Sequence, residues 1–307
     1  MSKIVTVTLN PAYDTTVVLD ELSSEKINRP VEESRVPAGK GINISETLKT
    51  LGCPNVAVAI VGRDSLEAFR RPLFDKGLEC RFVVTDGTVR ENLTILSGGE
   101  TYKINRAGEG VDDQADGRVL ALLADLFEPG DIAVFSGSAP EGLTGEKLER
   151  LIMNTAARGY KIVIDSEAVS ADMLMRIKPW LIKPNEFELA KIVGRGFADV
   201  MEMLASCNEL VSNGVGQVVL SLGEHGLYAI TRDETVFAVP PEVEAVSTVG
   251  AGDNALAGYI YSMLSGKTLG ECAAFAAACG TAAVQSALPY LEDTKEVDGL
   301  IEKIKII

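Results

Sequence analysis

The sequence predicts an α/β protein with a mostly parallel sheet covered by helices on both faces. Short apolar runs typical of buried strands alternate with helical patterns through most of the 307 residues. At 46% hydrophobic residues, the chain can bury one large core. A few early strand-like segments break the alternation, so we expect a second, small sheet beside the main one.

The first half alternates between runs of period two and runs of helical period. The expected elements are strand 3–9, helix 44–51, strand 57–61, helix 66–76, strand 81–85, helix 114–127 and strand 131–136. Asn10-Pro11 ends the first strand, and Gly52 ends the first helix. The interrupting strand-like segments are 15–19, 35–37, 92–97 and 101–105. Gly98-Gly99 joins the last two segments, which we therefore interpret as a hairpin.

The second half alternates more regularly. The expected elements are helix 145–158, strand 161–166, helix 168–175, strand 180–183, helices 186–193 and 199–213, strand 217–222, a hairpin of 226–231 with 235–239, and a helical stretch at 271–284. Ligands in such sheets bind beyond the carboxyl ends of the strands. The polar segments that we expect there are Asp14, 136–138, 183–188, 221–223 and 250–253.

Composition excludes several classes of function. The net charge of −15 argues against a broad nucleic-acid surface. The stretch 1–14 does not have the pattern of a signal peptide, and 273–284 is too short to cross a bilayer, so we expect no membrane association. Five cysteines without a C-x-x-C pair indicate a reduced, cytoplasmic protein. His225 is the only histidine, which argues against histidine triads and histidine-rich metal sites.

The stretch 247–258, STVGAGDNALAG, carries the strongest chemical signal. Gly250, Ala251 and Gly252 form a turn that enters a helix, where unpaired N–H groups and the helix dipole favour an anion. Asp253 follows at once, which suits phosphoryl transfer to a hydroxyl. The alternative is a tight loop with a capping aspartate. A dinucleotide site is rejected because the acid at the required distance, Glu271, lies in a helical stretch.

Three further segments contain candidate ligands, each with a structural alternative. Lys40 lies in the glycine turn 38–43 and could bind a phosphate, or be an ordinary exposed lysine. Arg90 could clamp a phosphate, although a single arginine at the end of a strand is usually solvated. Asn185 and Glu188 could hold Mg²⁺ directly or through water, or form a helix-capping box.

Taken together, these segments resemble the ribokinase-like (PfkB) family of sugar kinases over the whole chain. STVGAGD, KPNxxE, SGSxP, GKGIN and TLNPAxD occur in the expected order. The GKG and T-x-R-x-N segments resemble the branch that phosphorylates sugar phosphates, the 1-phosphofructokinases and tagatose-6-phosphate kinases. The resemblance implies one ribokinase-like three-layer domain, 1–307, with a β-sheet lid from about 12–37 and 88–107 that pairs with a second subunit.

The resemblance also implies roles for individual residues. Asp253 would be the catalytic base in the turn of Gly250, Ala251 and Gly252, and the amides of Ala251, Gly252 and Asp253 would form the anion hole. The sugar phosphate would be held by Asp14, Gly39, Lys40, Asn43, Arg90, Asn105 and Ser138. The ATP site would contain Lys183, Asn185, Ser221, Gly223, Gly226, Thr248, Gly250, Gly252 and Gly280. Asn185 and Glu188 would organise Mg²⁺, with a monovalent cation left open.

The implied reaction is ATP-dependent phosphorylation of fructose 1-phosphate to fructose 1,6-bisphosphate. Tagatose 6-phosphate and fructose 6-phosphate are the alternative substrates within the family. A non-catalytic sugar-phosphate sensor is the alternative from a different class. The sequence departs from the family's motifs at two positions: Ala38 replaces a glycine, and Asn254 replaces the usual serine. It leaves the roles of Arg29 and Arg106 open.

Overall fold

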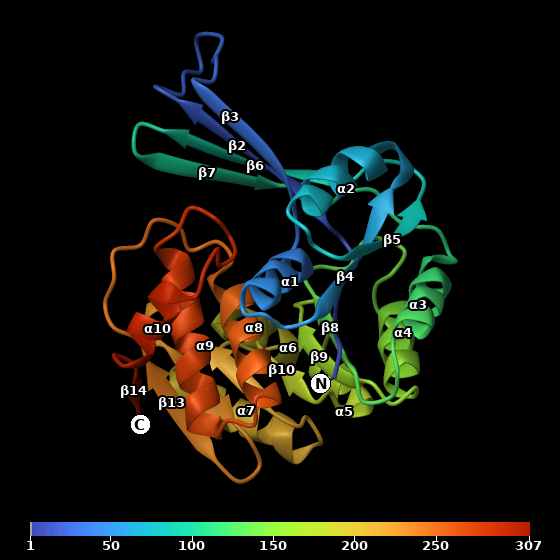
Figure 1. The fold of residues 1–307 in the computed structure, drawn as a ribbon, viewed down its shortest axis with the longest axis vertical. Coiled ribbons are helices and arrows are strands. Elements are labelled where there is room, and N and C mark those ends of the chain that lie inside the picture. The colour runs from blue at the N-terminus through green and yellow to red at the C-terminus, as the bar shows by residue number, and fades with distance from the viewer. Residues whose placement is uncertain (1) are drawn as a thin grey trace.

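The computed structural model describes residues 2–307, which fold around a large twisted sheet (Figure 1). Within those residues the sheet has ten strands in the order β14-β13-β12-β11-β10-β9-β8-β1-β4-β5. In chain order they are β1 Ile4–Thr8, β4 Asn55–Gly62, β5 Cys80–Thr85, β8 Ile132–Ser136, β9 Lys161–Asp165, β10 Leu181–Ile182, β11 Val218–Ser221, β12 Leu227–Ile230, β13 Thr235–Val239 and β14 Lys305–Ile306. The strands from β5 to β11 run parallel, and β12, β13 and β14 add an antiparallel edge.

Side chains of alternate strand residues enter two different cores. Val5 and Val7 of β1 belong to one apolar cluster, whereas Ile4 belongs to another. The same division holds in β8, where Phe135 lies in the first cluster and Val134 in the second. Because successive side chains of a strand point to opposite faces, a run that is apolar at every position requires cover on both faces.

Helices provide that cover in two layers. The first face is covered by α3 Ala115–Leu126, α4 Glu146–Ala156, α5 Ala171–Ile177, α6 Glu186–Val193 and α7 Val200–Ser212. The second face is covered by α1 Lys40–Thr50, α2 Leu66–Asp75, α8 Ala251–Leu264 and α9 Leu269–Val284, with α10 Lys295–Ile301 packed outside α9. Within the described chain, none of these helices combines the length and apolar character needed to cross a bilayer.

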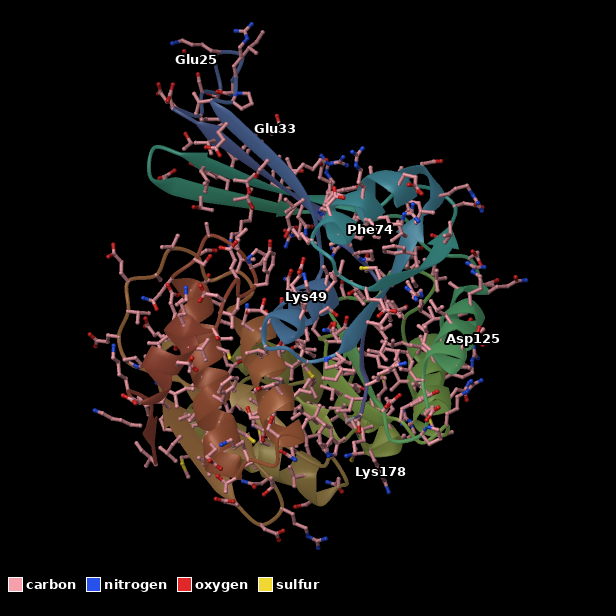
Figure 2. All side chains as sticks on the ribbon, viewed as in Figure 1. Glu25, Glu33, Lys49, Phe74, Asp125 and Lys178 are labelled. Atoms are coloured by element: carbon pink, nitrogen blue, oxygen red, sulfur yellow. The ribbon has the colours of Figure 1, made fainter. Side chains whose placement is uncertain are left out.

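A second sheet of four strands stands away from the main body (Figure 1). Its order is β3-β2-β6-β7, from β2 Ala12–Leu19, β3 Glu32–Ala38, β6 Arg90–Ser97 and β7 Glu100–Asn105. The central pair β2 and β6 is parallel, and the two outer pairs are antiparallel. Glu25 and Glu33 mark its far end in Figure 2. We call this element the small sheet.

The predicted fold class is confirmed, because a mostly parallel sheet lies between helix layers and a smaller sheet accompanies it. The hairpin across Gly98-Gly99 is also confirmed. Several expected bounds were wrong. The first helix begins at Lys40 rather than at 44, so the glycine turn is shorter than expected. The expected strand 180–183 has only two paired residues, and the pattern missed α10 and β14 at the carboxyl end.

The contact between α8 and α9 provides a test of this packing. A Cβ added at Gly258 in α8 would lie 2.6 Å from Cys279 Sγ in α9, which is too close for unstrained packing. Gly258→Ala should therefore destabilise the protein by about 1–3 kcal/mol, measured by urea unfolding.

Gly117→Ala in α3 is the matched control, because nothing lies within 4 Å of its added Cβ. Alanine favours a helix interior by about 1 kcal/mol over glycine, so this variant should be as stable as the wild type or more so. Equal unfolding midpoints for the two variants would contradict the close packing of α8 on α9.

Candidate active site

The amino-terminal turn of α8 presents an acid at the start of a helix, beside a sharp turn. Gly250 has a left-handed backbone with φ 82°, and a Cβ there would lie 2.0 Å from the Pro289 carbonyl oxygen. Only glycine satisfies both constraints. Asp253 lies in the first turn and is 6% exposed. The structure therefore places a buried carboxylate directly after a turn whose N–H groups have no helical partner.

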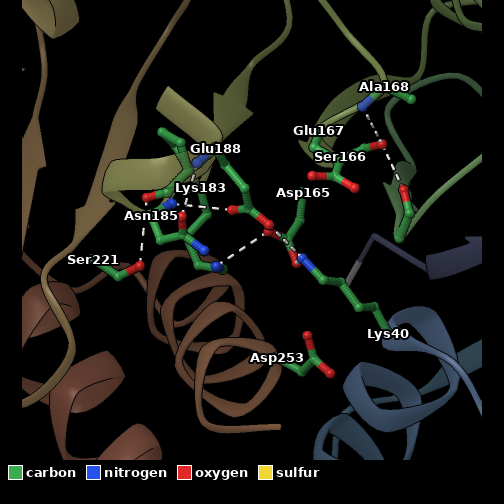
Figure 3. A network of polar contacts seen from close by, with 12 residues as sticks. Lys40, Asp165, Ser166, Glu167, Ala168, Lys183, Asn185, Glu188, Ser221 and Asp253 are labelled. Atoms are coloured by element: carbon green, nitrogen blue, oxygen red, sulfur yellow. Dashed lines mark hydrogen bonds and ion pairs between the residues drawn. The ribbon is translucent and has the colours of Figure 1, made fainter. Parts of the chain in front are cut away.

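Two lysines and an aspartate form an ion cluster close to this turn, in which Asp165 and Lys183 are buried and Lys40 is partly exposed (Figure 3). Asp165, at the carboxyl end of β9, lies 3.1 Å from Lys183 Nζ and 3.5 Å from Lys40 Nζ. Glu188 Oε1 accepts a hydrogen bond from Lys40 Nζ at 2.8 Å. A Cβ on Gly252 would lie 3.1 Å from Lys183 Nζ, so this cluster borders the α8 turn.

Burial and neighbouring charges together shift the pKa values of Asp165 and Asp253 in opposite directions. Burial would raise the pKa of Asp165, but the ammonium groups of Lys183 and Lys40 outweigh it and hold that pKa below its ordinary value. Burial, and then the negative charge of Asp165, raise the pKa of Asp253 well above its ordinary value, against the lysines and Asn43. Asp253 is therefore the acid of this site with the greater affinity for a proton.

Helix α1 delivers the polar groups that face Asp253. Lys40 is its first residue, and one turn later Asn43 Nδ2 donates to Asp253 Oδ2 at 2.8 Å. Burial would lower the pKa of Lys40, but the surrounding carboxylates raise it above its ordinary value, so this lysine stays charged. Gly39 directly precedes the helix with φ 149°. Helix α1 thus brings Lys40 and Asn43, two of the residues expected to bind the sugar phosphate, to the side of Asp253.

Asn185 and Glu188 form the capping box that was the structural alternative for this pair. Glu188 N–H donates to Asn185 Oδ1 at 2.8 Å, and Asn185 N–H donates to Glu188 Oε2 at 3.0 Å. The other oxygen of Glu188 holds Lys40. Residues 2–307 contain no group of three or more His, Cys, Asp or Glu arranged to bind a metal. The residues fit Mg²⁺ only as outer ligands, with phosphates and water completing its shell.

The residues expected to bind the sugar phosphate fall into two groups. Gly39, Lys40 and Asn43 lie at the α8 turn, as described above. A second group surrounds the base of the small sheet, where Asn92 Nδ2 donates to Asp14 Oδ1 at 2.9 Å. Asp14 lies inside β2, so the expectation that it follows a strand end of the main sheet was wrong.

Arg90 and Ser138 are linked to each other through Asn10. Arg90 donates to the carbonyl oxygens of Asn10 and Arg106 at 3.1 and 3.0 Å, and Asn10 Nδ2 donates to Ser138 Oγ at 3.2 Å. Burial lowers the pKa of Arg90, with Asp14 opposing this change. Arg90 also lines a cleft with Asn10. Asn105 pairs with Asn92 across the hairpin and is exposed.

The residues expected to bind ATP are spread along the strand ends and the α8 turn. Ser221 forms a parallel bridge with Asn185, which brings two of them together. Gly280 packs on the α8 turn, where a Cβ would lie 3.3 Å from the Ala251 carbonyl oxygen. Gly223 and Thr248 are exposed, whereas Gly226 is buried against β13. No hydrogen bond or ion pair among the described residues joins Gly226 or Thr248 to the ion cluster.

Sequence reasoning missed Asp165, the acid at the centre of the ion cluster. A signal was present, because it is an acid directly at the carboxyl end of a predicted buried strand, and such ends converge on the ligand site. Asn10 and Asn92 were also missed. Both stand in motifs quoted above, TLNPAxD and T-x-R-x-N, but their hydrogen bonds depend on which strands become neighbours.

Comparisons with known proteins identify the family of the chain. The model of the pfkB family carbohydrate kinases matches residues 7–294. A 1-phosphofructokinase from Haemophilus influenzae is 33% identical, with 100% of this chain and 98% of that protein covered. Phosphofructokinase-2 from Escherichia coli in complex with potassium superposes with a TM-score of 0.91 at 27% identity, covering 99% of each chain. The same enzyme in complex with fructose-6-phosphate has a TM-score of 0.89 at 26% identity and the same coverage.

Proposed function

This chain belongs to the pfkB family of carbohydrate kinases, and from that membership we propose that it transfers the γ-phosphate of ATP to fructose 1-phosphate. The acceptor is the C6 hydroxyl, and the products are fructose 1,6-bisphosphate and ADP. The single observation that carries the proposal is the buried carboxylate of Asp253 beside the glycine turn, with Lys40 and Asn43 opposite it. A full-length relative named 1-phosphofructokinase supports the choice of sugar.

In the proposed reaction Asp253 acts as the general base. Asn43 occupies its Oδ2, which leaves Oδ1 for the proton of the C6 hydroxyl. As O6 forms its bond to the γ-phosphorus, the bond from that phosphorus to the β–γ bridging oxygen breaks and ADP leaves. The high proton affinity of Asp253 favours this transfer. The N–H groups of Ala251, Gly252 and Asp253 hold the charge that develops on the transferred group.

The other site residues are proposed to bind and orient the two substrates. Lys40, Arg90, Asp14 and Ser138 would hold the sugar phosphate, and Lys183 and the glycines of the α8 turn would face the nucleotide phosphates. When bound, Mg²⁺ neutralises phosphate charge, and Asn185 and Glu188 would hold its water shell. A requirement for a monovalent cation stays a prediction, supported by the potassium complex of the similar Escherichia coli enzyme.

Fructose 6-phosphate is the second candidate substrate. The solved structure of phosphofructokinase-2 with that sugar resembles this chain closely, although at lower identity than the 1-phosphofructokinase relative. Tagatose 6-phosphate remains an alternative within the family. The joint presence of Asp253, Asn185 and Glu188 argues against a non-catalytic sensor, because binding alone needs neither a base at the helix turn nor groups that organise Mg²⁺.

We also propose that the small sheet is a lid that pairs with a second subunit. Tyr102 and Ile104 are exposed, and the strand register puts them on one face with Leu93 and Ile95. Such a face on an element that projects from the body suits a partner of the same kind. A cytoplasmic location is proposed because all five cysteines among the described residues are free and four are buried.

A substrate panel tests the proposed reaction. ADP release is measured with MgATP and equal concentrations of fructose 1-phosphate, fructose 6-phosphate and tagatose 6-phosphate. We expect kcat/KM to be highest for fructose 1-phosphate. Asp253→Asn should lower kcat by about 10²–10⁴-fold with every sugar, because it removes the base. This variant is also the control for a contaminating kinase. Release of ADP with none of the sugars would favour the sensor.

The pH dependence of kcat/KM tests the electrostatic role of Asp165. Activity requires deprotonated Asp253, so it should be lost as the pH falls through the raised pKa of that residue. Asp165→Asn removes the like charge, so the low-pH limb of the kcat/KM profile should move to lower pH. Turnover should also fall, because two lysines lose their partner. The substrate phosphate titrates near pH 6, so the shift between variants is the diagnostic quantity. A low-pH limb that stays in place or moves to higher pH in Asp165→Asn would contradict the electrostatic role of Asp165.

The mass in solution tests the proposed dimer. Light scattering should give twice the 32.7 kDa of one chain for the wild type. Ile104→Glu should give the single-chain mass, because it places a charge on the exposed apolar face. Met201→Glu, on the exposed surface of α7, is the control and should keep the wild-type mass. A wild-type mass of 32.7 kDa would refute the dimer.

A further inference from the structure

Asn254 directly follows the proposed base in α8, and the proposed chemistry makes no use of it. Its side chain is fully buried, with 0% exposure. This is also a position at which the sequence departs from the serine that is usual in the family's motif. A buried amide is costly unless all its donors and acceptors are paired, so its partners indicate what it does.

The amide of Asn254 makes four hydrogen bonds and thereby uses its full capacity. Nδ2 donates to the carbonyl oxygens of Gly250 and Pro289 at 2.7 and 2.9 Å. Oδ1 accepts from the Leu291 N–H at 3.0 Å and from the Thr47 hydroxyl. These partners lie in three segments, namely the α8 turn, the loop 289–291 and α1. One side chain therefore joins all three.

These bonds form the second of two links between α1 and α8. The first is the hydrogen bond from Asn43 to Asp253, and the second, one turn further along α1, joins Thr47 to Asn254. Thr50 extends the contact by donating to the Leu291 carbonyl oxygen at 2.7 Å. The loop thus lies fixed between α1 and the turn that carries the base.

The loop 289–291 also packs directly against the glycine turn. The Pro289 carbonyl oxygen occupies the space in which a side chain on Gly250 would lie. Asn254 binds that same carbonyl oxygen and also that of Gly250. The direction of the N–H groups of Ala251, Gly252 and Asp253 depends on the position of this turn, because they belong to its peptide units.

We propose that Asn254 is a positioning residue for the phosphoryl transfer, an inference that rests on the proposed kinase function. It holds the base and the turn amides at a set distance from α1, which carries Lys40 and Asn43. A serine offers at most one donor and two acceptors, so it cannot keep four partners in three segments. The Leu291 N–H and the Thr47 hydroxyl would then be buried without this partner.

The main test is Asn254→Ser, measured in the sugar-phosphate assay with the purified full chain. We expect kcat to fall by about 10–100-fold, because a displacement of about 1 Å in a reacting group can cost 100-fold. KM for the sugar phosphate and for ATP should change less than about threefold, since ground-state binding groups remain. The assay is run well below the unfolding temperature determined by circular dichroism for each variant.

Thr47→Val separates the link between the helices from the rest of the network. It removes the hydroxyl that donates to Asn254 and that accepts from the Leu291 N–H at 3.4 Å, but leaves the other three bonds of the amide. A smaller fall in kcat in the same direction is expected. Thr155→Val in α4 is the matched control, because Thr155 is equally buried and its hydroxyl bonds only to the Leu151 carbonyl oxygen. This control should keep wild-type kcat.

Asn254→Asp provides a readout that loss of stability would not change. It keeps the acceptors and the shape, but loses donation to Gly250 and Pro289 and adds a negative charge beside Asp253. The low-pH limb of kcat/KM should therefore move to higher pH than in the wild type. Asn254→Ser should leave that limb in place while lowering kcat.

Three outcomes would overturn the inference. Wild-type kcat in a folded Asn254→Ser protein would remove the positioning role. A loss of activity that merely follows the unfolded fraction, with Thr155→Val equally affected, would make the residue structural only. A wild type that releases no ADP with any of the three sugars would refute the proposed function first, and the inference with it.

Discussion

The ion cluster of Lys40, Asp165 and Lys183 is the interaction on which the rest of the site depends. A carboxylate without exposure is stable as an anion only when cations lie against it, and Asp165 has one on each side. Those cations come from α1 and from the end of β10, so their charge fixes the relation of these elements to β9 (Figure 3). Removing Asp165 would leave two ammonium groups facing each other and would change the field at Asp253.

A second set of contacts, made by neutral amide and hydroxyl groups, positions the proposed base. Asn43 and Thr47 on α1 meet Asp253 and Asn254 on α8, and the loop 289–291 is held between the two helices. The charged cluster and the amide network therefore both border the same turn. Burial and then the charge of Asp165 raise the pKa of Asp253, whereas the hydrogen bonds from amide and hydroxyl groups set where its carboxylate lies.

Local patterns predicted most of the fold because each element satisfies its own periodicity. Apolar runs such as that of β8 are buried on both faces, and the Gly98-Gly99 hairpin formed as expected. The errors arose where tertiary contacts override local signals. Strand β10 keeps only two paired residues, and β14 forms because its residues pair with the edge strand β13. The site was predicted where motifs carry it, at Lys40, Asn43 and Asp253, and was missed at Asp165.

The sequence by itself determined the fold class and the glycine turn with its acid, because periodicity and backbone freedom are properties of neighbouring residues. Only the tertiary structure decided that Glu188 caps a helix and holds Lys40 at once, and that Asp165 lies between two lysines. The hydrogen bond from Lys40 to Glu188 joins residues 148 positions apart. The distances of these contacts, and hence the pKa of Asp253, follow from which strands become neighbours in the sheet, which no local stretch of the chain specifies.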